Sequence, residues 1–323
     1  MAPDDKTRGS TVLVVRASDR SSLRWHRLRV DGRQAACLEA GAGQTVVLLH
    51  GWGLSHHVYR DAVRRLADDG VRVLAPALPG FGGTTSLPRE RSDLRGYADW
   101  VAAFLDAMDV REPVLLVGHS FGGAVATVTA HAHPNRVGAL VLVNAVGGAA
   151  WTRGDDGVRP MTDRPLWDWG WNFSIDVRNP RRMARVLPVI VSEVLPNLVL
   201  DPRAFVRAAR LARDADLTEE LNDLHRRGLP VVIIWSPRDT VVTEASIDAL
   251  REALGDAHTI SVPGGHSWLL GDPDRFGEVM TNVVAVAEKA RWLDAGRARR
   301  LWRRVRARAP RRRSDESATA AAR

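Results

Sequence analysis

Short runs of apolar residues, bounded by glycine, proline or polar residues, recur through the middle of the chain and constrain its fold most. Six such runs occur at residues 45–51, 71–78, 113–119, 139–146, 230–236 and 259–264. Continuous apolar runs of this length are typical of strands that helices cover on both faces of a parallel sheet. Helical patterns lie between them, at residues 59–68, 97–108, 243–254 and from Pro273 onward. The sequence therefore predicts an α/β protein with a mostly parallel sheet.

Two segments depart from this alternation. Near the start, Asp31-Gly32 separates two strand-like segments, which indicates a hairpin with a tight turn. After Gly147-Gly148 the alternation stops until about residue 215, and short helical pieces are punctuated by prolines at 160, 165, 180, 188, 196 and 202. We interpret this stretch as one insertion into a single α/β domain.

The segment Gly118–Gly123 reads GHSFGG and lies between an apolar strand pattern and an apolar helix pattern. A strand that turns directly into a helix holds its central residue in a strained conformation with the side chain projecting, and flanking glycines allow close backbone approach. The N-terminus of the following helix directs its free N–H groups at developing negative charge. This context predicts Ser120 as a nucleophile; the alternative is a serine that only caps the helix.

A serine nucleophile requires a histidine base, which a carboxylate orients. Asp239 and His266 each follow an apolar run, at the strand ends where such sheets place ligand chemistry. Of two other acids, Asp216 precedes a helix and Asp256 lies before its strand, at the wrong edge. We therefore expect Asp239 and His266 to complete a catalytic triad; the alternatives are a turn-forming aspartate and an ordinary loop histidine.

Acyl transfer also requires an oxyanion hole, in which each backbone donor typically contributes about 3 kcal/mol. Phe121, directly after the nucleophile, is expected to supply one N–H group. Trp52, in the loop His50-Gly51-Trp52-Gly53 after the first apolar run, is expected to supply the other. We interpret His50 as a structural hydrogen-bonding residue of that loop.

Five motifs in this order resemble the α/β-hydrolase superfamily, in its serine-hydrolase, esterase-like branch. They are HGWG (50–53), LPGFGG (78–83), GHSFGG (118–123), the aspartate after the run at 230–236, and GGH (264–266). The resemblance implies a mostly parallel eight-stranded sheet flanked by helices, a helical cap and catalysis by Ser120, His266 and Asp239. The first two loops also resemble those of small carboxylic-ester hydrolases of the pimeloyl-carrier methyl esterase type. One departure is TVVTE after the acid, where many relatives have proline.

The resemblance and the length of 323 residues together suggest a division of the chain into five parts. We expect an N-terminal extension (1–25), a first part of the core (26–146), a cap or lid insertion (147–215), a second part of the core (216–290) and an Arg-rich tail (291–323).

Aromatic residues suggest how the substrate is bound. We consider as substrate contacts three tryptophans of the insertion, Trp151, Trp167 and Trp171, together with Trp268, two residues after the proposed base. The alternative is that these rings only pack the cap onto the core. One arginine among Arg153, Arg159 and Arg164 could meet a substrate carboxylate, although loop arginines are usually solvated.

We therefore expect a serine hydrolase that cleaves a carboxylic ester or related acyl bond of a small, largely apolar substrate through an acyl-enzyme. Thioester, lactone and carbon–carbon bond hydrolysis and perhydrolase activity remain open alternatives on the same site. A serine nucleophile excludes the dehalogenases and epoxide hydrolases of this fold, which attack with a carboxylate. From a different class of function, a non-catalytic ligand-binding protein on the same scaffold also remains open.

The net charge of +8 is concentrated at one end of the chain. Residues 291–313 carry eleven arginines and one acid, a local charge of +10, which leaves −2 for the other 300 residues. We expect either peripheral contact of a basic amphipathic helix with an anionic membrane or a solvated tail. The oligomeric state cannot be read from the sequence.

Other partners and cofactors are not indicated. A single cysteine and histidine pairs without suitably spaced acids give no metal site, and a phosphate-binding loop is missing. The arginines of the tail lack the interleaved aromatic residues of a nucleic-acid surface beyond Trp292 and Trp302. We expect a small-molecule substrate, no cofactor, no metal and no nucleic acid. Because neither a signal peptide nor a long apolar stretch is recognisable, we expect a cytoplasmic protein.

Overall fold

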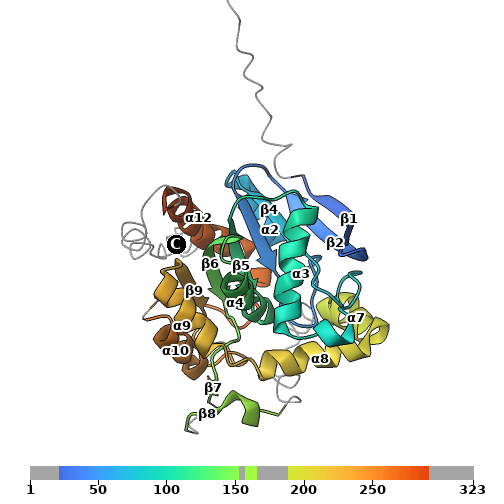
Figure 1. Cartoon of the computed structure of the whole chain (residues 1–323). Helices are drawn as coiled ribbons and strands as arrows, with labels where there is room; N and C mark the ends of the chain where they lie inside the picture. Colours follow the sequence, from blue (N-terminus) through green and yellow to red (C-terminus); the bar gives the residue numbers. More distant parts are fainter. Residues whose placement is uncertain (1–21, 153–156, 166–187, 256, 291–323) are drawn as a thin grey trace, which may run out of the picture.

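The fold is built on an eight-stranded sheet (Figure 1). The structure is a computed structural model, and it describes residues 22–152, 157–165, 188–255 and 257–290. The sheet has the strand order β1-β2-β4-β3-β5-β6-β9-β10. Its strands are β1 (Arg24–Val30), β2 (Arg33–Ala40), β3 (Thr45–Leu49), β4 (Arg72–Pro76), β5 (Val114–His119), β6 (Val137–Val143), β9 (Val231–Trp235) and β10 (His258–Ser261).

Strand β2 is antiparallel to both of its neighbours, and the other neighbouring strands pair in parallel. The tight turn between β1 and β2 has positive φ at both central residues, 49° at Asp31 and 73° at Gly32. Two-residue hairpin loops favour this conformation because its twist matches that of the strands, and aspartate followed by glycine accommodates it well. The predicted hairpin is confirmed.

Helices cover the sheet on both faces because its central strands are apolar on both. Alternate residues of β3 point to opposite sides, so Val47 and Leu49 join one apolar core and Val46 and Leu48 the other. The first core is closed by α3 (Leu94–Ala107), α4 (Phe121–Ala132), α9 (Thr218–Arg227) and α10 (Glu244–Ala253). The second is closed by α2 (Arg60–Asp68), α11 (Trp268–Gly271) and α12 (Pro273–Ala290). Each of the six apolar runs overlaps a strand of the sheet, and β6 and β10 begin two residues and one residue before their runs. The predicted α/β fold class is confirmed.

Between β6 and α9 the chain leaves the sheet. Its described part contains β7 (Ala150–Trp151) paired with β8 (Arg159–Pro160), the short turn η2 (Met161–Asp163), the π-helical turn η4 (Ile190–Val194), α7 (Leu195–Leu200) and α8 (Pro202–Arg213). Phe205 of α8 packs against Trp52, with 4.6 Å between ring centroids, and its carbonyl accepts a 2.8 Å hydrogen bond from the Trp52 indole. Helix α8 is therefore anchored to the loop that follows β3.

No helix in the described ranges is long and apolar enough to cross a membrane.

Candidate active site

Ser120 occupies the turn between β5 and α4, at the carboxyl edge of the sheet. Its backbone has φ 53° and ψ −119°, a conformation that is costly for a residue with a side chain. The neighbouring glycines make this turn feasible. A Cβ atom at Gly118 would lie 2.4 Å from the Gly122 carbonyl oxygen, and one at Gly122 would lie 2.4 Å from the Leu49 carbonyl oxygen. The strand and helix can therefore approach closely enough to hold the Ser120 side chain outward only with glycine at both positions.

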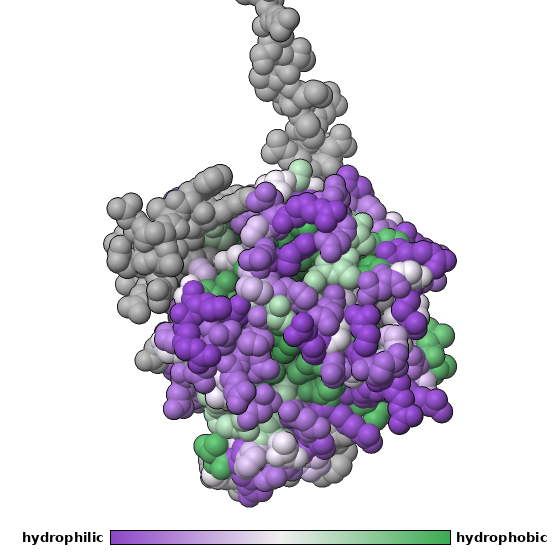
Figure 2. Space-filling view, in the orientation of Figure 1, coloured by the Kyte–Doolittle hydropathy of each residue, from purple (hydrophilic) through white to green (hydrophobic). Residues whose placement is uncertain are grey.

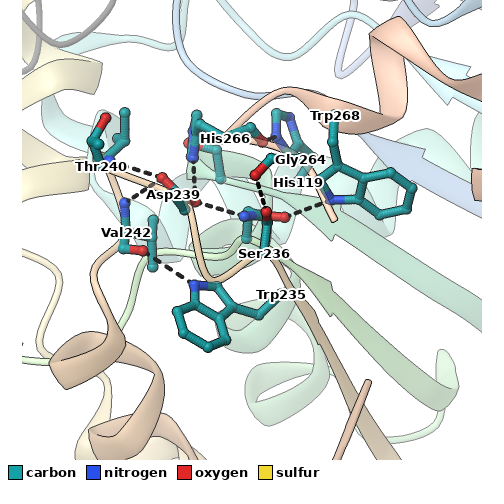
Figure 3. Close-up of polar contacts among 12 residues, drawn as sticks. His119, Trp235, Ser236, Asp239, Thr240, Val242, Gly264, His266 and Trp268 are labelled. Atoms are coloured by element: carbon teal, nitrogen blue, oxygen red, sulfur yellow. Dashed lines mark hydrogen bonds and ion pairs between the residues drawn. The ribbon is translucent and has the colours of Figure 1, made fainter. Parts of the chain in front are cut away.

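His266 lies between Ser120 and Asp239. Its Nε2 is 2.9 Å from Ser120 Oγ, and its Nδ1 is 2.8 Å from Asp239 Oδ2. The histidine lies in the loop after β10, and the aspartate in the loop after β9. The structure thus brings together the three side chains predicted from the sequence. In this arrangement a proton can move from the hydroxyl to the imidazole. Figure 3 shows His266 and Asp239.

Asp239 is held ionised by its hydrogen bonds. Burial alone would raise its pKa, but the adjacent His266 and hydrogen bonds from His266, Asn144 and the Val242 amide hold the pKa below its usual range. Oδ1 accepts the N–H groups of Val241 and Val242 at 2.7 and 2.9 Å. A carboxylate bound in this way can fix the imidazole tautomer and stabilise an imidazolium.

The Ser120 side chain opens into a pocket lined by Gly51, Trp52, Leu54, His119, Ser120, Val241, His266 and Ser267. The backbone N–H of Trp52 donates to no acceptor among the described residues. The backbone N–H of Phe121 lies in the first turn of α4, where N–H groups have no acceptor within the helix. Neither N–H group has a hydrogen-bond acceptor among the described residues. His50, as expected, is structural: its Nε2 accepts the Leu78 N–H at 2.8 Å.

Asn144, directly after β6, contacts the acid and was not anticipated from the sequence. Its Nδ2 donates to Asp239 Oδ2 at 2.6 Å, and its Oδ1 accepts the Trp268 indole N–H at 2.8 Å. Its φ is 43°, a left-handed conformation that asparagine tolerates better than most residues. The available signal was its position, since a polar residue that ends an apolar run lies at the same sheet edge as Ser120.

His119, the variable residue of the G-x-S-x-G motif, is fully buried and was also missed. Its Nδ1 lies 2.6 Å from the Tyr59 hydroxyl, which accepts the Gly51 N–H at 3.1 Å. Its Nε2 lies 3.1 Å from the backbone carbonyl of His266. Burial, together with the nearby His266, lowers the pKa of His119 to about 3, so the ring is neutral at neutral pH. One polar chain therefore connects the loop after β3 with the loop that carries the base.

Two of the tryptophans considered as substrate contacts are structural. Trp268 begins α11, and its ring packs against Phe276. Its indole N–H donates to Asn144, the residue that donates to Asp239, so Trp268 contacts the acid through Asn144 (Figure 3). Trp151, in β7 of the insertion, is buried in the first apolar core, where its ring faces the guanidinium of Arg164. Neither lines the pocket at Ser120. The other two, Trp167 and Trp171, lie outside the described residues, as does the tail.

Arg164 is likewise not placed to meet a substrate carboxylate. Its side chain is buried, with the guanidinium carbon 5.1 Å from the Trp151 ring centroid. Its Nη2 donates to the Thr240 carbonyl at 3.0 Å, and its Nη1 donates to the Val241 carbonyl. Arg164 therefore ties the base of the insertion to the loop that carries Asp239.

The chain is similar to known proteins over most of its length. The model of the alpha/beta hydrolase family matches residues 46–279. A protein provisionally named a non-heme haloperoxidase, from Mycobacterium phage D29, is 28% identical over 276 residues, which cover 80% of this chain and 92% of that one. A pimeloyl-[acyl-carrier protein] methyl ester esterase from Aromatoleum aromaticum is 28% identical over 262 residues, covering 74% and 97%.

Solved structures share the fold. The esterase EaEST from Exiguobacterium antarcticum superimposes with a TM-score of 0.63 at 20% sequence identity, and the match covers 80% of this chain and 98% of that one.

Proposed function

The chain belongs to the alpha/beta hydrolase family and is an enzyme, and from this premise we propose that it is a serine hydrolase acting on carboxylic esters or related acyl bonds. The observation that carries the proposal is the pair of contacts made by His266, 2.9 Å to Ser120 Oγ and 2.8 Å to Asp239 Oδ2. A histidine bound to a hydroxyl at one nitrogen and to a carboxylate at the other is the arrangement that activates a serine nucleophile.

In the proposed mechanism, Ser120 Oγ attacks the substrate carbonyl while its proton passes to His266 Nε2. The N–H groups of Trp52 and Phe121 stabilise the oxyanion. His266 then gives its proton to the departing alcohol, which leaves an acyl-enzyme on Ser120. A water molecule that loses a proton to His266 attacks this ester and releases the acid and the serine hydroxyl. Throughout, Asp239 fixes the tautomer of His266 and stabilises its charged form.

The lining of the pocket supports a small, largely apolar acyl group. Trp52, Leu54 and Val241 contribute apolar surface beside Ser120, and the lining among the described residues contains no Asp, Glu, Lys or Arg. The relative from Aromatoleum aromaticum, a methyl ester esterase by name, favours a carboxylic ester as the scissile bond. The haloperoxidase-named relative favours perhydrolysis as the second candidate, in which hydrogen peroxide takes the place of water on the acyl-enzyme.

Replacing Ser120 by alanine tests the nucleophile. We expect hydrolysis of short p-nitrophenyl esters by Ser120→Ala to fall by at least 10³-fold, because nucleophile and base act as a unit. Ser261→Ala is the matched control, since Ser261 is an exposed residue of β10 outside this pocket. This control should remain within a few-fold of the natural protein. Wild-type rates in Ser120→Ala would overturn the proposal.

A fluorophosphonate probe separates an enzyme from a ligand-binding protein on the same scaffold. The probe should modify the natural protein and Ser261→Ala covalently, but not Ser120→Ala. An unlabelled natural protein would favour the binding protein. Substrates can then be ranked with a panel of acyl chain lengths, thioesters, lactones and vinylogous diketones, with and without hydrogen peroxide.

A further inference from the structure

The helical segment formed by η4 and α7 presents apolar side chains to solvent. A surface helix ordinarily turns its apolar face toward the core and its polar face outward. Here five large apolar residues lie on the outside, with exposed fractions of 56% at Val191, 49% at Leu195, 37% at Leu198, 69% at Val199 and 80% at Leu200. We call these five residues the apolar ridge. Figure 2 shows hydrophobic surface at the edge of the molecule where Figure 1 places α7.

The inner face of the same segment carries two buried polar residues that form hydrogen bonds with other parts of the chain. Glu193 is buried and accepts a hydrogen bond from the Ser55 hydroxyl. Asn197 is buried four residues later; its Oδ1 accepts the Gly82 N–H at 3.0 Å and its Nδ2 donates to the Gly53 carbonyl at 3.2 Å. These contacts fix the orientation of the segment, so the outward direction of the apolar ridge follows from specific contacts.

The neighbouring helix α8 adds positive charge beside the apolar ridge. Its buried side consists of residues such as Phe205 and Ala208, which leaves Arg203, Val206 and Arg210 exposed. The carboxylate of Asp201, at the start of α8, is held within the protein, because it accepts hydrogen bonds from the Ala204 N–H and the Ser86 hydroxyl. With Glu193 also turned inward, the outer surface of this region combines apolar side chains with arginines.

We propose that the apolar ridge and the exposed arginines of α8 dock onto an anionic lipid surface. Exposed large apolar side chains enter the boundary between headgroups and acyl chains, and the arginines bind the phosphate groups around them. A second copy of this chain suits the surface less well, since pairing two such faces would bring the arginines of both copies together. This inference concerns attachment and stands apart from the proposed hydrolysis.

A fluorescent label on the apolar ridge tests the proposal. The one cysteine of the chain, Cys37, is buried, so a thiol reagent can be directed to an introduced cysteine. We would label full-length Val199→Cys with an environment-sensitive fluorophore, and likewise Val158→Cys as the matched control. Val158 is 68% exposed beside β8, on a different part of the molecule from α7 (Figure 1). Vesicles of phosphatidylcholine alone would be compared with vesicles that contain phosphatidylglycerol.

The proposal predicts a blue shift and a several-fold rise in emission for the label at position 199 with phosphatidylglycerol vesicles only. The label at position 158 should change little. Adding Val191→Ser and Leu200→Ser to the Val199→Cys protein should reduce the response several-fold. Attachment through the Arg-rich tail alone would leave the labels at 199 and 158 with equal responses, and this outcome would overturn the proposal. The readout requires no hydrolysis, so the result is independent of the outcome for Ser120→Ala.

Three other results would also refute docking to lipid. An unchanged label at position 199 would exclude insertion. A blue shift without vesicles that grows with protein concentration would identify a second copy as the occupant. A blue shift without vesicles that is independent of concentration would show that the chain itself covers the ridge.

Discussion

Replacing Asn144 by alanine perturbs the acid of the proposed triad without altering the triad itself. Asn144 is fully buried, with one bond to the carboxylate of Asp239 and one to the indole of Trp268. The substitution removes both bonds. It also places alanine at φ 43°, in a region that asparagine tolerates much better. We expect the native state to be destabilised by all three effects.

The magnitude follows from the two contacts and the backbone. A hydrogen bond to a charged acceptor contributes about 1.5–3 kcal/mol, and a buried indole N–H left without an acceptor costs about 1–3 kcal/mol. The left-handed backbone adds about 1 kcal/mol for a residue such as alanine. Because effects within one network do not add fully, we expect the free energy of unfolding to fall by about 3–5 kcal/mol at neutral pH.

Urea-induced unfolding at pH 7 measures this loss, and two further variants divide it. Asn144→Gly removes the same hydrogen bonds but tolerates the backbone, so its loss should be smaller by about 1 kcal/mol, offset in part by the entropy of glycine. Trp268→Phe removes the indole donor and leaves Asn144 bound to Asp239. A loss below about 1 kcal/mol for Asn144→Ala would refute the reasoning.

The loss should also depend on pH. In the native protein the pKa of Asp239 is lowered, so the stability that its carboxylate contributes is present at neutral pH and disappears as the pH falls through that pKa. The amide of Asn144 favours the ionised form, and its removal raises the pKa. The free energies of unfolding of Asn144→Ala and the natural protein should therefore become more similar as the pH falls. If their difference stayed constant, the bond from Asn144 would not stabilise the ionised form of Asp239.

Two other predictions concern buried polar groups. Burial lowers the pKa of His50 to about 4 and of His56 and His119 to about 3, so between pH 7 and 5 the unfolded chain gains protons that the native state does not take. Each histidine should lower the free energy of unfolding by about 2 kcal/mol over that interval. In His56→Phe, the urea midpoint should therefore fall less between pH 7 and pH 5 than in the natural protein. An equal fall of the midpoint in the two proteins would contradict this. Tyr59→Phe leaves the Gly51 N–H and His119 Nδ1 unpaired, and urea unfolding should show a loss of about 2–5 kcal/mol, with an unchanged midpoint as the contrary result.

Local patterns in the sequence predicted the strands, the helices and the three residues of the proposed triad. The apolar runs identified the strands, because a strand covered on both faces must be apolar on both. The helix expected from Tyr97 begins at Leu94 instead, where Asp93 caps it through the Gly96 N–H at 2.7 Å. The sequence predicted the triad of Ser120, Asp239 and His266 because parallel strands end at the same edge of the sheet. Polar residues that directly follow these strands therefore lie close together.

Features that depend on contacts between distant segments could not be predicted in this way. Asn144 and Asp239 are 95 residues apart in the sequence, and His119 binds a tyrosine 60 residues before it. Trp268 follows a pocket residue, Ser267, but α11 begins there and turns the ring into the core behind Asn144. A surface helix ordinarily has apolar side chains on its inner face, but α7 has Asn197 there, because this side chain binds loops of the core.

The buried guanidinium of Arg164 has a consequence for how such proteins can be recombined. It comes from the insertion, yet the carbonyls that it binds, those of Thr240 and Val241, come from the core, and the amide of Val241 in turn binds the acid. A chimera that received an insertion without an arginine at this position, but kept its own loop after β9, would leave the Thr240 and Val241 carbonyls without these two donors. The natural unit of exchange is therefore discontinuous: residues 150–165 have to be transplanted together with residues 239–242.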